Sequence, residues 1–181
     1  MLVVRLVLSR LDFGNALLVD IPVYLVRRLQ SVLNASARLI YGLKRSDHIT
    51  DALVSLHWLR VPERIQYKVA MLTYKVLHDT TPRYLGPFDR AADLPGRRSL
   101  RSAITSRLVV PSSRLSTVGS RSFSVSGPRV WNALPEDVVS APSLSTFRRR
   151  LIQPSSSSNH TCICSHLTVH LAPQWSLNDS K

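Results

Sequence analysis

The first half of the chain repeats apolar residues at the spacing of an α-helix, and this pattern limits the fold more than any other feature. Over residues 22–40 the apolar face comprises Leu25, Val26, Leu29, Val32, Leu33, Leu39 and Ile40. A second repeat begins near Pro62 and Glu63, and its apolar face comprises Ile65, Val69, Leu72 and Val76. A helix with one apolar face has to bury that face against another element. The two repeats therefore predict helices packed on one another.

Residues typical of helix ends lie at the two ends of these repeats. Asp20 precedes Pro22 by two residues, which suits an N-cap region followed by proline in the first turn, and Gly42 can end the helix. Between the repeats, residues 49–57 predict a shorter helix. Residues 2–12 are apolar on too many sides for a lone surface helix, so we expect them to pack against the other two.

Side chains on and beside the second repeat are expected to have structural roles. Arg64, Lys68 and Lys75 are predicted to point away from its apolar face. Trp58 and Tyr74 could stack on bases, but aromatic residues at helical spacing among Leu and Val are usually packing residues. We assign neither aromatic residue a ligand role.

The composition changes after about residue 93, where Ser, Arg and Pro become dominant. Residues 107–111 could form a short extended piece, and residues 119–131 could contain a helical turn that Pro128 limits. Ser143 is the predicted N-cap of a last helix that ends near Leu151.

Together these patterns predict a mainly α protein, in which a small helical bundle is followed by an irregular segment and a tail. We expect a helical domain over residues 1–93 and a basic, partly irregular segment over residues 94–153 that ends in a short helix. We expect residues 154–181 to be a disordered tail, because the serine run at residues 155–158 is typical of a flexible linker.

The chain is strongly basic, with a net charge of +13 and with twenty Arg against four Lys. A planar guanidinium binds phosphate oxygens through paired hydrogen bonds and stacks on bases, whereas an ammonium group is a compact point charge. The excess is concentrated in residues 94–153, which contain ten basic and two acidic side chains. This distribution indicates a polyanion as the class of partner, such as RNA or DNA bound through its phosphates. Arginine-rich codon usage and solvated helix faces are the alternative explanation.

Nine arginines of this segment are the predicted nucleic-acid-binding residues. They are Arg97, Arg98, Arg101, Arg107, Arg114, Arg121, Arg148, Arg149 and Arg150. Such contacts would position a nucleic acid without reading its sequence. The last three lie in the final turn of the predicted C-terminal helix, where cations also complement the helix dipole without any ligand.

No arrangement of residues suited to catalysis occurs in the sequence. It lacks a Tyr-x-Asp-Asp polymerase loop, a phosphate-binding glycine loop and a serine in a nucleophile elbow. Asp47 and Asp51 are near each other, but they flank a turn-like sequence in which Asp acts as a cap, and they do not form the close pair that binds two metal ions. We therefore expect no catalytic residues, no cofactor and no enzymatic activity.

A cluster near the C-terminus contains side chains of the types that bind zinc, namely Cys162, Cys164, His166 and His170. Single residues separate Cys162 from Cys164 and Cys164 from His166, which leaves little room to arrange four ligands around a tetrahedral ion. We expect a tail that happens to contain these residues and no metal site.

The apolar stretch at the N-terminus is too short to anchor the chain in a membrane. It ends at Leu8, is interrupted by Arg5, and falls far below the roughly 20 residues that span a bilayer. It also lacks a signal-peptide cleavage site. We expect an intracellular protein without a membrane partner, in either the nucleus or the cytoplasm.

Landmarks spaced along most of the chain carry a resemblance to a known family. They are Ser9-Arg-Leu-Asp12, Asn15, Asp47-His-Ile-Thr50, Leu56-His-Trp-Leu59, Glu63-Arg-Ile65, Arg98-Ser-Leu-Arg101, Trp131-Asn132 and Ala141-Pro-Ser-Leu-Ser-Thr-Phe147. In order and spacing they resemble the region after the reverse transcriptase domain of jockey-like non-LTR (LINE-type) retrotransposons. Two positions depart from the family pattern: Gly14 replaces the usual Cys, and Gly127 replaces an Ala before Pro. The likeness ends near Gln153.

This resemblance implies a noncatalytic piece of an RNA-directed DNA polymerase, with at most weak, nonspecific RNA or DNA binding. If so, the reading frame upstream of Met1 should encode the polymerase domain. Two alternatives stay open. The amphipathic helices could form a protein-interaction module that docks on an upstream polymerase domain or on another copy of the chain. The chain could also be a genomic relic without a selected function.

Overall fold

The computed structural model describes residues 2–93, 106–115 and 117–152, which are mainly helical, as predicted. The helices are α1 (Leu2–Asp12), α2 (Val23–Tyr41), α3 (Thr50–Ser55), α4 (Val61–Leu77), α5 (Phe123–Asn132), α6 (Glu136–Val139) and α7 (Leu144–Ile152). Short 3₁₀ turns are η1 (Asn15–Leu18), η2 (Arg83–Leu85), η3 (Ala91–Asp93) and η5 (Gly119–Arg121). No helix in these ranges is long and apolar enough to cross a bilayer.

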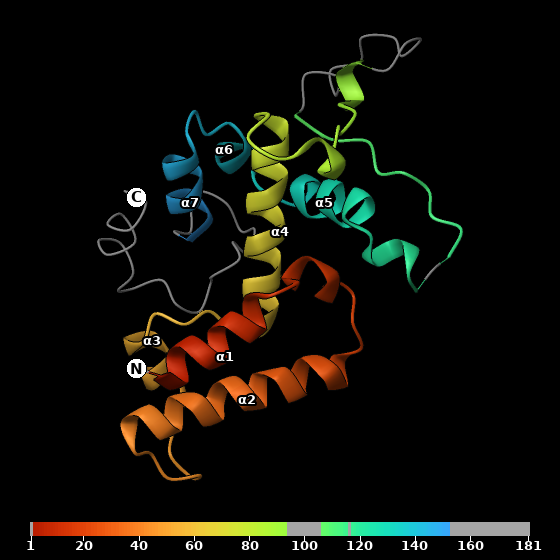
Figure 1. Cartoon of the computed structure of the whole chain (residues 1–181). Coiled ribbons are helices and arrows are strands. Elements are labelled where there is room, and N and C mark those ends of the chain that lie inside the picture. Colours follow the sequence, from red (N-terminus) through yellow and green to blue (C-terminus); the bar gives the residue numbers. More distant parts are fainter. Residues whose placement is uncertain (1, 94–105, 116, 153–181) are drawn as a thin grey trace.

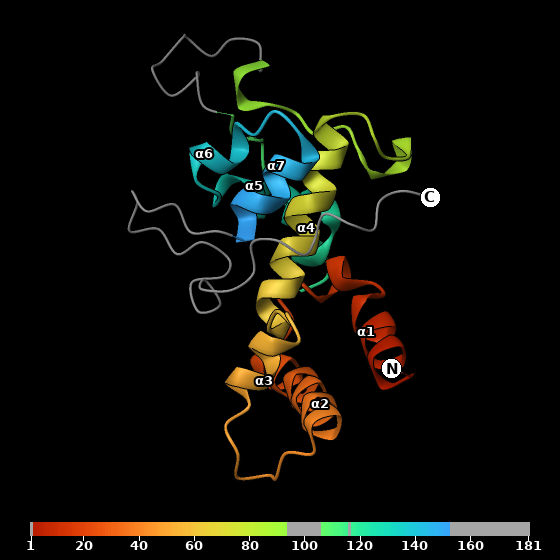
Figure 2. The ribbon, with the colours of Figure 1, turned by 90° about the vertical axis from the view of Figure 1, so that its left-hand side faces the viewer.

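Helix α4 is the central element of the fold. Figures 1 and 2 both show α1, α2 and α3 gathered near its N-terminal end, and α5, α6 and α7 around its C-terminal half. The backbone N–H of Arg60 donates to the Glu63 carboxylate at 3.2 Å, and Pro62 occupies the first turn, where a missing N–H costs nothing. The predicted start of this helix near Pro62 and Glu63 is therefore confirmed.

The N-terminal half of α4 shares one core with the first three helices. Leu33 of α2, Leu53 of α3 and Val69 of α4 are all buried in it. Trp58 lies in the same core and is only 5% exposed, so its predicted packing role is confirmed.

The C-terminal half of α4 builds a second, aromatic core with α5, α6 and α7. The ring centroid of Tyr74 lies 4.5 Å from that of Phe147 in α7, and the centroid of Phe147 lies 5.7 Å from that of Trp131 in α5. The Tyr74 hydroxyl donates to the carbonyl of Ala141 at 3.2 Å, so its polar end is satisfied inside the core. This core therefore joins α4 to elements that lie beyond residue 93.

The apolar face predicted for residues 22–40 is only partly buried. Leu33 has no exposed surface, but Val32 is 50% exposed and Leu39 is 69% exposed. Helix α2 lies at the edge of the bundle in both views, so among the described residues no element covers this flank. The prediction that Val32, Leu39 and Ile40 share the buried face is wrong. Periodicity shows which apolar residues lie on one side of a helix, but it does not show how much of that side other elements cover.

Helix α2 also begins without the predicted aspartate cap. Its N-cap residue is Pro22, and no side chain caps it. Asp20 adopts a φ of 54°, and its carboxylate accepts a hydrogen bond from Arg129 of α5 at 2.7 Å. The helix does end at Gly42 as predicted, because that residue has a φ of 62° and its N–H donates to the carbonyl of Arg38.

Helix α5 continues through Pro128 to Asn132, so the prediction that this proline limits the helix is wrong. The N–H that proline lacks would have bonded the carbonyl of Ser124, a residue near the start of the helix that is exposed to solvent. The neighbouring Gly127 allows α5 to approach the core closely. A Cβ atom there would lie 2.8 Å from Cζ of Phe88.

Candidate nucleic-acid interface

Six of the nine predicted arginines lie within the described residues. Arg97, Arg98 and Arg101 lie outside them, as do the zinc-type cluster of Cys162, Cys164, His166 and His170 and the predicted tail over residues 154–181. Within the described ranges, no group of three or more Cys, His, Asp or Glu side chains could bind a metal ion.

Arg107 lies on a short extended segment that is held against the C-terminal half of the fold. Residues 89–91 pair with residues 107–109 through two backbone hydrogen bonds of 2.9 Å, which confirms the predicted extended piece. The side-chain amide of Asn132 donates to the carbonyl of Leu108 and accepts from its N–H, each at 2.8 Å. The backbone on the C-terminal side of Arg107 is thus fixed, while its side chain is exposed.

Trp131 fixes the other side of the same segment. Its indole N–H donates to the carbonyl of Ser106 at 2.9 Å, and its ring is only 4% exposed. The Trp131-Asn132 landmark therefore has a structural role here, which is to position the segment that carries Arg107.

Arg114 and Arg121 differ in their surroundings. Arg114 is exposed, and it makes no hydrogen bond or ion pair with the described residues. Arg121 is half-buried in η5, and its Nε atom is buried without a hydrogen-bond partner among them. Only Arg114 of this pair presents its whole guanidinium to a ligand from solvent.

The arginine triplet at the end of α7 is also divided by its position on the helix. The helix begins as predicted, with the Ser143 hydroxyl accepting from the N–H of Thr146 at 3.3 Å. Arg149 is exposed, whereas Arg148 and Arg150 are half-buried and have partners in the protein. The Arg150 guanidinium donates to the carbonyl of Asp137 in α6. Of the three side chains, Arg149 is therefore the most accessible to phosphate.

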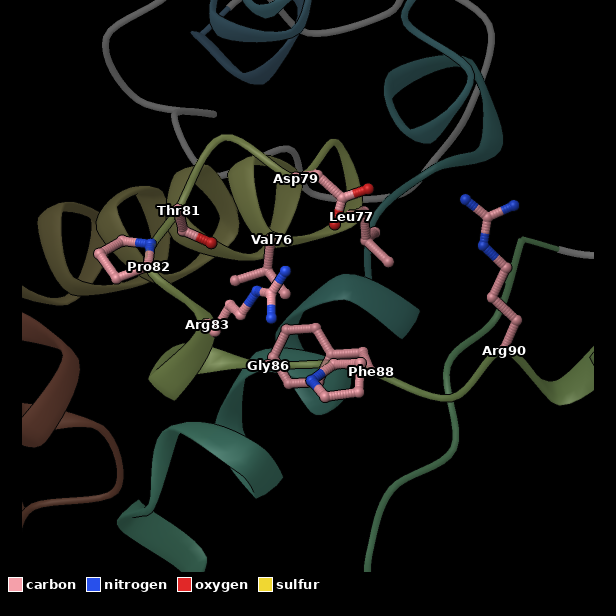
Figure 3. A pocket seen from close by; sticks show the side chains of 10 residues that line it. Val76, Leu77, Asp79, Thr81, Pro82, Arg83, Gly86, Phe88 and Arg90 are labelled. Atoms are coloured by element: carbon pink, nitrogen blue, oxygen red, sulfur yellow. The ribbon is translucent and has the colours of Figure 1, made fainter.

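Two further arginines, which the sequence did not single out, lie at the surface beside the end of α4. Arg83 and Arg90 line a cavity of about 360 Å³ beside the end of α4 (Figure 3). Both are exposed, and Arg90 belongs to the segment that pairs with residues 107–109. The sequence does contain a local signal for binding at Arg83. Pro82 and Gly86 are typical of a turn, and between them Arg83 is followed by an aromatic residue, a combination found where bases stack.

Other charged groups are used inside the fold. The Arg64 guanidinium donates to the Asp12 carboxylate through Nε at 2.5 Å and Nη2 at 2.9 Å, so the prediction that Arg64 points away from the packed face is wrong. Burial by itself raises the pKa of Asp12. The hydrogen bond and charge of Arg64, the charge of Lys68 and the amide of Asn15 outweigh burial and lower this pKa below its ordinary value of 3.8.

Comparison with known proteins adds no relative. No protein-family model matches the chain, and neither a curated protein nor a solved structure is significantly similar to it. The resemblance to the post-polymerase region of jockey-like retrotransposons stays a prediction.

Proposed function

We propose that this chain is a noncatalytic helical module that binds RNA or DNA through contacts between arginine side chains and phosphates. It would be related to the post-polymerase region of a retrotransposon reverse transcriptase, and it would neither polymerise nor cleave nucleic acid. Inside the cell, its contacts would be weak and would not depend on sequence.

One observation carries the proposal: several exposed arginines have no partner among the described residues. The side chains of Arg107, Arg114 and Arg149 make no hydrogen bond or ion pair with the described residues. In contrast, Asp12 is paired with Arg64 and Asp20 with Arg129. An excess of guanidinium groups that is not consumed by internal pairs supports binding of a polyanion, because each phosphate contact releases condensed counterions.

The test is a measurement of salt dependence with the purified chain. Affinity for a fluorescently labelled single-stranded RNA or DNA should fall steeply between about 50 and 200 mM salt, with a slope of about 0.7 per phosphate contact on a double-logarithmic plot. A flat salt response would exclude phosphate contacts as the basis of binding.

Variants locate the contacts. Arg107→Gln, Arg114→Gln and Arg149→Gln should each weaken binding and lower the salt slope by about one contact. Arg64→Gln is unsuitable for this purpose, because that guanidinium is used by Asp12. Arg45→Gln is the matched control, since Arg45 is exposed in the loop between α2 and α3. Equal effects of all four variants would indicate a general charge effect and no defined interface.

A second candidate function, protein interaction, is favoured by exposed apolar side chains on α2 and on the connection between α1 and α2. Phe13 is 86% exposed, Leu17 69%, Tyr24 63% and Leu39 69%. Large apolar side chains gathered on neighbouring elements often mark a protein-binding surface. If α1, η1 and α2 form such a surface for another copy of the chain, sedimentation velocity should show concentration-dependent assembly that Phe13→Ser and Leu17→Ser abolish. A monomer at all concentrations would exclude self-association.

A further inference from the structure

The cavity beside the end of α4 has walls of two kinds (Figure 3). Val76, Leu77 and Phe88 form apolar walls, and Asp79, Arg83 and Arg90 provide the charges. The turn that carries Arg83 packs tightly on the helix, because a Cβ atom at Gly86 would lie 2.6 Å from Cγ1 of Val76. In the view of Figure 3 the side chain of Arg83 lies near the Phe88 ring, and Arg90 lies on the other side of Asp79 and Leu77.

The charged groups of this cavity have no partners in the part of the chain that the structure describes. The side chains of Asp79, Arg83 and Arg90 make no hydrogen bond or ion pair with the described residues, although a carboxylate and two guanidinium groups line one cavity. Two guanidinium groups and one carboxylate suit a ligand with two anionic groups, one for each arginine, and with a hydrogen-bond donor for the carboxylate.

Backbone conformation accounts for the place of Asp79. This residue follows α4 and adopts a φ of 52°, the left-handed region that glycine most readily occupies after a helix. Its N–H donates to the carbonyl of Val76 at 3.2 Å, so the turn is closed by the backbone and does not use the carboxylate. A glycine would serve the turn equally well, so the carboxylate is available for another contact.

Two aromatic residues, Tyr84 and Phe88, follow Arg83 closely in the sequence. The Phe88 ring lines the cavity and is supported by Phe123, with 5.4 Å between ring centroids. Tyr84 directly follows Arg83 and is 83% exposed. An exposed aromatic ring next to a guanidinium is the combination on which single-stranded bases stack.

We infer that this cavity binds one nucleotide of single-stranded RNA. The guanidinium groups of Arg83 and Arg90 bind the phosphates on the two sides of the nucleotide, the Asp79 carboxylate accepts a hydrogen bond from the ribose 2′-hydroxyl, and Tyr84 stacks on a base. DNA has no 2′-hydroxyl, so it would bring its phosphates near the Asp79 carboxylate without offering that carboxylate a hydrogen-bond donor. An acidic peptide would bring carboxylates toward Asp79, which disfavours it. This inference rests on the proposed function and adds a preference for RNA.

The experiment compares two probes that differ only at the 2′ position. Fluorescence anisotropy with the full chain measures the affinities for an oligouridylate dodecamer and for the oligodeoxyuridylate dodecamer at one salt concentration. We expect the RNA to bind about tenfold more tightly, the ratio that one charge-assisted hydrogen bond supplies. Asp79→Gly should bring the two affinities to within about twofold of each other, because it removes the acceptor and keeps the left-handed turn.

Asp20→Gly is the matched control. Asp20 also has a positive φ, of 54°, and a carboxylate, but it lies away from this cavity. Removing it should raise or lower both affinities together and leave their ratio unchanged. Arg83→Gln and Arg90→Gln should weaken RNA binding more than Arg45→Gln does, and circular dichroism should show that every variant keeps its helix content.

The outcomes separate the two proposals. Equal affinities for the RNA and DNA probes in the unmodified chain, or a preference that Asp79→Gly does not change, would overturn the RNA site and leave the proposed function standing. Displacement of the RNA by an acidic peptide as readily as by unlabelled RNA would also overturn it. Absence of binding to both probes at low salt would overturn the proposed function as well.

Discussion

The carboxylate of Asp12 at the end of α1 and the guanidinium of Arg64 in α4 are joined by two hydrogen bonds across 52 positions of sequence. The side chain of Arg64 is 16% exposed and that of Asp12 is 34% exposed, so water can replace neither partner completely. The amide of Asn15 also donates to Asp12, at 3.1 Å. The pair fixes the end of α1 and the turn after it against the central helix.

Asp12→Asn should lower the free energy of unfolding by about 1–3 kcal/mol, because it leaves the mostly buried guanidinium of Arg64 without its charged acceptor. Equilibrium urea unfolding measures this loss. Asp20→Asn is the control: the Asp20–Arg129 pair is about half exposed, at 45% and 51%, and should contribute below about 1 kcal/mol. Equal losses in the two variants would contradict the special role of the Asp12–Arg64 pair.

The stability that Asp12 contributes should depend on pH in one direction. Its pKa is lowered in the folded protein, so the ionised form is favoured by folding. The contribution is complete above the ordinary value of 3.8 and is lost as the pH falls through the lower folded value. The difference between the unmodified chain and Asp12→Asn should therefore be full at about pH 6 and shrink below about pH 4. A difference that stays constant down to about pH 2 would contradict the lowered pKa.

Phe147→Ala should cost about 3–5 kcal/mol, because Phe147 has no exposed surface and packs on both Tyr74 and Trp131. If this variant does not fold, Phe147→Leu should still show a loss of about 1 kcal/mol. Phe13→Leu, at a position that is 86% exposed, should change stability by less than about 0.5 kcal/mol. Thermal unfolding of the three variants tests the aromatic core. An unchanged stability of Phe147→Leu would contradict the role of Phe147 in that core.

A chain that ends at residue 93 should lose cooperative unfolding, although residues 1–93 contain the predicted helical domain. Ala70, Met71 and Tyr74 of α4 are covered by α5, α6 and α7 and would become exposed. Calorimetry of the shortened chain should show no sharp transition. A transition at the temperature of the full chain would show that the first core is independent.

Ser126→Ala should raise stability, because the Ser126 hydroxyl is fully buried and has no hydrogen-bond partner among the described residues. We expect a gain of about 0.5–1 kcal/mol, from the removal of a desolvated polar group and from the higher helix propensity of alanine. Ser36→Ala is the matched control, since Ser36 is also a buried helical serine but its hydroxyl donates to the carbonyl of Val32 at 2.9 Å. Ser36→Ala should gain less stability than Ser126→Ala. A larger gain in Ser36→Ala would contradict the conclusion that the Ser126 hydroxyl has no hydrogen-bond partner among the described residues.

The candidate interface was only partly predictable from the sequence. Arginine excess drew attention to residues 94–153, but counting charges could not separate exposed Arg149 from Arg150, which donates to the carbonyl of Asp137 in α6. It also passed over Arg83 and Arg90, because they belong to a range whose net charge is modest. Their cavity forms only where the turn after α4 folds back on Val76 and residues 89–91 pair with residues 107–109.

The sequence by itself determined where the main helices form and where several of them end. Apolar periodicity, Pro62 in a first turn, Gly42 after α2 and Ser143 before α7 act through contacts within a few residues, so they can be read locally. Only the tertiary structure decided which apolar flank of α2 is covered, that Asp20 pairs with Arg129 instead of capping a helix, and that Arg64 is held by Asp12. Those outcomes depend on groups far apart in the chain, whose distances are set by the packing of whole helices against α4.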